Sequence, residues 1–80
     1  MWKCFYGRMV WRYYNSEGKT VICINGVYNA NGKDFKHWDA VVTNNSLNRT
    51  GRILSDNNLE LLKLKCLIVA KELGWNIEKV

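Results

Sequence analysis

The chain has 80 residues, which support one hydrophobic core and therefore a single domain over residues 1–80. Hydrophobic residues make up 48% of it and charged residues 24%, which excludes a disordered or fibrous chain. The formal net charge of +5 excludes an acidic imitation of DNA and favours an anionic partner, although such an excess also serves solubility.

The sequence predicts a cytoplasmic protein that binds no metal or cofactor. It contains no run of about 18 apolar residues, and charges interrupt its first apolar residues too early for a secretory signal. Cys4, Cys23 and Cys66 are far apart and odd in number, so they favour reduced thiols over a disulfide framework. His37 is the only histidine, and the dispersed glycines form no phosphate-binding loop.

The first half of the chain predicts an antiparallel meander. Residues 2–14 are dense in aromatic residues, Met and Val, and predict one long strand. A turn containing Gly18 follows, and then a β-branched strand over residues 20–24. A second turn at Asn31-Gly32 precedes a third strand through residues 40–43. We therefore expect three strands.

The second half predicts a helix. Residues 44–52 have the composition of a loop, and Ser55 or Asp56 is a suitable N-cap for a helix with apolar periodicity from Leu59 to Leu73. Residues 75–80 alternate again and predict a short fourth strand. The expected fold class is α+β, a small antiparallel β-meander with one C-terminal α-helix packed across it.

The predicted helix has apolar residues on two sides. One side is expected to form the core and consists of Leu59, Leu62, Cys66, Val69, Ala70 and Leu73. The other side carries Leu61, Leu64, Leu67 and Ile68. Because one sheet covers one side only, the second side requires a cover. That cover is the terminal strand, a second copy, a partner, or the 44–54 loop with its Leu47, Ile53 and Leu54. We assign Leu61, Leu64 and Ile68 to partner binding.

A second candidate surface lies on the predicted first strand. Period-two alternation places Tyr6, Arg8, Arg12 and Tyr14 on one of its sides. Tyrosine and arginine anchor protein interfaces, and they also bind phosphates and stack on bases. The same residues are also typical of a plain solvated face with aromatic side chains packed under arginine, and all three interpretations stay open. The residues assigned to a nucleic-acid interface are Arg8, Arg12, Lys19, Arg49 and Arg52.

The favoured prediction is a non-enzymatic protein that binds another protein. His37 has Asp34 and Asp39 close by in sequence, but this proximity gives no positioned acid–base pair. Ten asparagines, eight lysines and no proline are what an AT-rich gene encodes, as is common among accessory genes of phages and mobile elements. We therefore expect an inhibitor of a host or defence factor. The alternatives are a nucleic-acid-binding domain and a self-associating regulatory or structural subunit, such as a homodimer.

Overall fold

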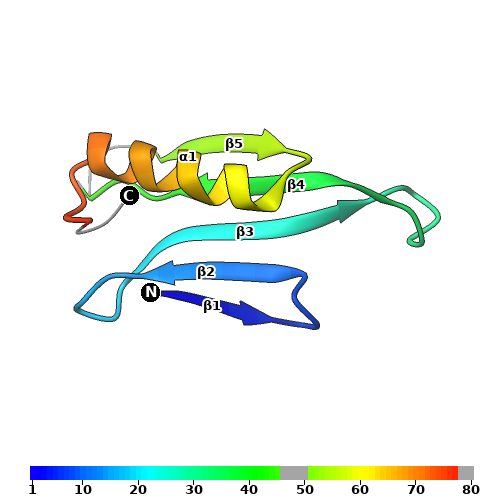
Figure 1. Ribbon diagram of the computed structural model, residues 1–80, viewed down its shortest axis with the longest axis horizontal. Coiled ribbons are helices and arrows are strands. Elements are labelled where there is room, and N and C mark those ends of the chain that lie inside the picture. Colours follow the sequence, from blue (N-terminus) through cyan, green and yellow to red (C-terminus); the bar gives the residue numbers. More distant parts are fainter. Residues whose placement is uncertain (46–50, 78–80) are drawn as a thin grey trace.

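The computed structural model describes residues 1–45 and 51–77, which form a five-stranded antiparallel sheet with a helix packed across one face (Figure 1). The strands lie side by side in chain order, as in a meander. The elements are β1 (Trp2–Phe5), β2 (Val10–Tyr14), β3 (Thr20–Tyr28), β4 (Phe35–Val42), β5 (Arg52–Asp56) and α1 (Leu59–Glu72). The predicted α+β class is confirmed, but the sheet has five strands where three, or four with a terminal strand, were predicted.

The aromatic N-terminal segment forms a hairpin of β1 and β2, so the prediction of one long strand is wrong. The chain reverses at three consecutive residues with positive φ, Tyr6 at 52°, Gly7 at 62° and Arg8 at 70°. Only glycine adopts this conformation without steric cost, so two of the three residues give no sign of a turn. Tyr6 and Arg8 consequently lie in the turn and not on a strand face beside Arg12 and Tyr14.

The two later turns are where the sequence predicts them. Gly18 and Gly32 have φ values of 79° and 72°. The side chain of Asn15 accepts hydrogen bonds from two backbone amides of the first turn, and the side chain of Asn31 does the same in the second. These asparagines stabilise the turns locally, which is why the sequence alone indicates them.

The segment before the helix differs from its predicted structure. Residues 52–56 pair with β4 and form the edge strand β5 instead of continuing the loop. Ser55 and Asp56 therefore lie in a strand, and the helix N-cap is Asn58, whose side-chain oxygen accepts a hydrogen bond from the amide of Leu61 at 3.0 Å. The helix itself is confirmed and has 14 residues. Among the described residues, no helix has the length and apolar character needed to cross a membrane.

The C-terminal segment packs against the fold without joining the sheet. The short strand that alternation predicts there is wrong for residues 75–77, while residues 78–80 lie outside the described part of the chain. Ile77 is buried, and the indole N–H of Trp75 donates to the carbonyl of Thr43 at 2.7 Å. This segment therefore closes one end of the core.

The core lies between α1 and the middle of the sheet. The buried helix side chains are Leu62, Cys66, Val69 and Ala70, with Leu59 and Leu73 partly buried, as the periodicity predicts. They pack on Ile22, Ile24, Ala40 and Val42. Burial raises the pKa of the Cys66 thiol to about 12. The helix packs against β3, β4 and β5, so the β1–β2 hairpin extends the sheet beyond it (Figure 1).

Candidate functional site

The sheet face opposite α1, here called the open face, is covered by no other element of residues 1–45 and 51–77. Directly paired residues of antiparallel strands share a face. Strand pairing joins Lys3 to Arg12, Arg12 to Cys23, Cys23 to Val41 and Val41 to Ile53. One row of side chains thus crosses the open face from a cation on the β1 edge to an isoleucine on the β5 edge.

Four side chains of the hairpin form a basic–aromatic cluster at one end of this row. The ammonium of Lys3 lies 5.4 Å from the ring centroid of Tyr14, and the guanidinium of Arg12 lies 5.2 Å from that of Phe5. Side-chain hydrogen bonds with Tyr14 and Cys23 raise the pKa of Arg12. Cation–π contacts hold the two basic side chains in place, which lowers the entropy that binding would cost.

The charged side chains in the chain segment that contains this cluster are all positive. Residues 1–16 contain Lys3, Arg8 and Arg12 and no carboxylate, and the first acidic residue is Glu17 in the following turn. Six of the ten aromatic residues of the chain lie in the same segment. The hairpin is therefore the part of the chain best suited to an anionic partner.

The other end of the row is apolar and exposed. Val41 is 43% exposed and Ile53, on the edge strand β5, is 75% exposed. Soluble monomers rarely leave such side chains together on an uncovered sheet face without a binding role. The open face thus combines a cationic region with an apolar region along one line.

A hollow of ≈ 680 Å³ borders the basic–aromatic cluster. Its lining consists of Met1, Lys3, Phe5, Tyr13, Tyr14, Asn15, Ser16, Gly18 and Asn76. Three of the four cluster residues line it together with Tyr13, so an inserted group would meet three aromatic rings and an ammonium. Such pockets receive the anchoring side chains of protein partners.

A histidine, an aspartate and a serine lie together elsewhere on the open face. Asp39 Oδ1 accepts a hydrogen bond from the Ser55 hydroxyl at 2.6 Å and lies 2.9 Å from His37 Nε2. Nucleophilic catalysis by serine requires the histidine base beside the hydroxyl, whereas here the aspartate lies between them. The arrangement forms a polar region of the face and does not activate Ser55.

The solvent side of α1 forms a second candidate surface. Its apolar side chains are Leu61, Leu64 and Ile68, which are 44%, 45% and 47% exposed. The described residues of the 44–54 segment, which was expected to cover these side chains, do not cover them. Leu54 packs into the core beneath the helix, Ile53 lies on the open face, and Leu47 falls outside the described residues. Leu67, the fourth residue of the predicted second side, is half-buried.

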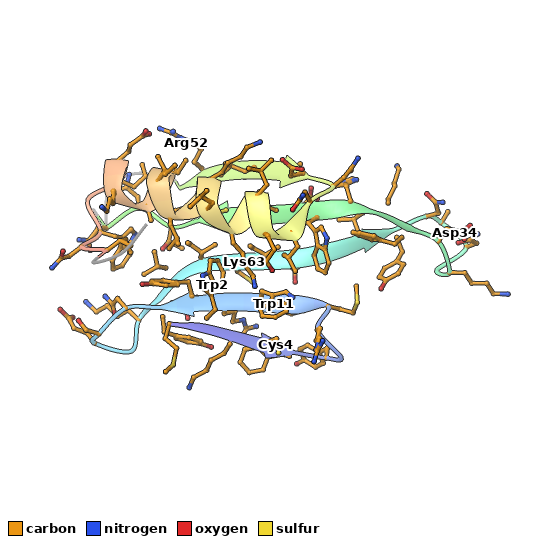
Figure 2. The ribbon with its side chains drawn as sticks, in the orientation of Figure 1. Trp2, Cys4, Trp11, Asp34, Arg52 and Lys63 are labelled. Carbon is orange, nitrogen blue, oxygen red and sulfur yellow. The ribbon has the colours of Figure 1, made fainter. Side chains whose placement is uncertain are left out.

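Two basic residues assigned to the nucleic-acid alternative lie near carboxylates and away from the open face. Lys19 lies 3.5 Å from Glu17 in the turn between β2 and β3. Arg52 lies 3.0 Å from Glu72 on the helix-covered side of the sheet, where Figure 2 labels it. Neither side chain lies on the open face, so the two do not extend the positive region around Arg12.

The remaining predicted site residues divide between the hairpin turn and its strands. Tyr6, 78% exposed, and Arg8 lie in the turn, whereas Arg12 and Tyr14 lie together on the open face. Arg49 lies outside the described residues. The open face also carries Lys3, Phe5, Val41 and Ile53, which the sequence pattern does not assign to a site. Recognition of a turn at Gly7 would have placed the first two on this face.

Comparison with known proteins identifies no family. No protein-family model matches the chain, and no curated protein or solved structure is significantly similar to it. The role of the open face is therefore inferred from its own side chains.

Proposed function

We propose that this is a non-enzymatic binding protein that engages a protein partner through the open face. The observation that carries the proposal is the single row from Lys3 and Arg12 to the exposed Val41 and Ile53. Protein interfaces combine an apolar centre with aromatic and arginine anchors, and this row supplies both on a face without a cover.

The row also defines the chemistry of the partner. Lys3 and Arg12 lie in a segment without carboxylates, so they complement acidic side chains on the partner. Val41 and Ile53 complement an apolar patch beside those acidic groups. The hollow next to Lys3 accommodates one anchoring side chain, and a carboxylate there would lie near the ammonium.

A protein fits this surface better than a nucleic acid does. Phosphate binding gains from each additional unpaired cation along a track. Of the basic residues assigned to that alternative, Arg52 is paired with Glu72 at 3.0 Å, and neither Arg52 nor Lys19 lies on the open face. The Val41–Ile53 end of the row offers phosphates no counter-charge, whereas it offers a protein an apolar contact.

The proposed mode of action is occupation of a partner's surface. The partner we propose is a host or defence factor, which binding would inhibit without any reaction being catalysed. The three cysteines are free thiols, which supports an encounter in the reducing cytoplasm.

The test is affinity capture of binding proteins with matched charge reversals. Arg12→Glu reverses a charge on the open face, and Lys33→Glu makes the same change in the exposed turn between β3 and β4. We expect one protein that the native chain and Lys33→Glu retain. Loss of a hot-spot contact worth about 2 kcal/mol would lower retention by Arg12→Glu roughly 30-fold.

Two results would contradict the proposal. One is equal retention of every captured protein by folded Arg12→Glu and by Lys33→Glu. The other would come from titration of labelled single- and double-stranded DNA and RNA with the protein at about 50 and about 200 mM salt. Tight binding that collapses at the higher salt and is lost with Arg12→Glu would assign the open face to nucleic acid.

A further inference from the structure

The solvent side of α1 has the spacing of a helix-pairing seam. Leu61, Leu64 and Ile68 occupy positions i, i+3 and i+7, which fall in one line along a helix. All three are nearly half exposed, so the seam is not part of the core. Apolar residues at this spacing are the contacts by which amphipathic helices pair.

Charges beside the seam fit an antiparallel copy of the same helix. Glu60 lies in the first turn of α1 and Lys71 in the last, eleven residues apart. At about 100° per residue, this separation returns both side chains to the same flank of the seam. In an antiparallel pair, Glu60 of each copy therefore lies beside Lys71 of the other.

These two residues are available for such contacts. The Glu60 side chain is 82% exposed, and its ion pair with Lys63 is long at 3.5 Å. Lys71 is exposed and has no ion-pair partner within residues 1–45 and 51–77. The arrangement repeats by two-fold symmetry, so two copies form the contact twice.

The opposite flank of the seam does not oppose this pairing. Its charged residues are Lys65, which lies 2.9 Å from Asp56, and Glu72, which lies 3.0 Å from Arg52. Because β5 already neutralises both, like charges do not face one another there. Antiparallel alignment also opposes the two helix dipoles favourably.

We propose that a second copy of this chain docks on α1 and forms a two-fold symmetric, antiparallel helix pair. The contact is isologous, because the same residues serve both copies. It leaves the open face of each copy free, since α1 and the open face lie on opposite sides of the sheet (Figure 1). The inference does not depend on what the open face binds, but a dimer would present two such faces and gain avidity.

The test is sedimentation equilibrium of the full chain over a wide range of concentrations. The native protein is expected to show a reversible monomer–dimer equilibrium in the micromolar range, and Leu64→Asp is expected to remain monomeric. Glu60→Lys and Lys71→Glu should each weaken the dimer roughly fivefold or more, because each places like charges at both contacts. The double variant carrying both changes should recover native affinity, and Lys33→Glu should behave as native.

Circular dichroism tests whether each variant is folded. If Leu64→Asp does not fold, the Glu60 and Lys71 charge variants test the dimer in its place. A native protein that stays monomeric at millimolar concentration would overturn the proposal. A dimer that forms equally well in both single charge variants would overturn it as well. So would a double variant no tighter than the single ones, since the antiparallel arrangement requires the exchange to restore attraction.

Discussion

The β1–β2 hairpin and the helix-covered part of the sheet differ in how they use apolar side chains. All the fully buried side chains in the described residues lie on β3, β4 and α1, and most of them are aliphatic. The hairpin segment has six of the ten aromatic residues, and none of them is fully buried. Coverage by α1, rather than side-chain size, therefore decides which residues form the core. Trp2, Trp11 and Tyr13 pack against the edge of that core, which leaves Phe5, Tyr6 and Tyr14 for contacts outside it.

One side chain links the two regions. Lys63 extends from α1 toward Trp2 and Trp11 of the hairpin, all three of which Figure 2 labels. Its ammonium lies 3.6 Å from the ring centroid of Trp11 and 5.5 Å from that of Trp2. Its side chain is only 12% exposed. The helix thus contacts the hairpin through a cation–π interaction.

The largest expected effect is a loss of stability in the helix-covered part of the sheet. Leu62→Ala should lower the free energy of unfolding by about 2–5 kcal/mol, because it leaves a cavity beneath the helix. Leu61→Ala, on the solvent side of the same helix, should cost less than about 1 kcal/mol. Urea unfolding at low micromolar concentration measures both. Equal losses would show that the helix does not bury one side preferentially.

The same comparison explains which parts of the fold the sequence could predict. The turns at Gly18 and Gly32 depend on local residues, as does the apolar periodicity of α1, and all three are confirmed. The hairpin turn was missed because Tyr6 and Arg8 adopt positive φ within a segment of strand-forming residues. Ser, Asp and Asn are about equally good N-cap residues, so local chemistry does not distinguish Ser55, Asp56 and Asn58. Pairing of β5 with β4, a long-range interaction, decides among them.

The candidate site depends still more on long-range structure. Arg12 and Tyr14 are two residues apart on one strand, so the period-two pattern of the sequence predicts that they share a face. The presence of Lys3, Val41 and Ile53 on that face follows from the register of four strand pairs, which no local pattern specifies. The exposure of Leu61, Leu64 and Ile68 follows from helical periodicity and was therefore accessible from the sequence.

A smaller effect is expected at the junction of the two regions. Lys63→Met keeps the aliphatic stem but removes the cation, and should cost about 1 kcal/mol of stability. The loss should appear as faster amide exchange in β1 and β2, with β3 and β4 unchanged. Lys33→Met in the turn between β3 and β4 is the control, because Lys33 contacts neither tryptophan. Uniform acceleration over all strands would contradict a local link.

The smallest effect concerns acid stability at the other side of the helix. The backbone N–H of Asn58 and the ammonium of Lys65 lower the pKa of Asp56. A lowered pKa means that the ionised carboxylate stabilises the fold above its ordinary pKa of about 4, and that this contribution is lost as pH falls further. Asp56→Asn should therefore be less stable than the native chain at neutral pH, and the difference should shrink on acidification. A difference that is constant from pH 7 to about pH 2 would contradict this assignment.

The most direct test of the account combines stability and binding in one variant. Arg12→Glu with Ile53→Glu alters both ends of the row on the open face and none of the buried core. We predict a free energy of unfolding within about 1 kcal/mol of the native value, together with loss of the captured protein partner. A folded double variant that retains the partner at native strength would contradict the assignment of the open face. An unfolded one would contradict the separation of the binding surface from the core.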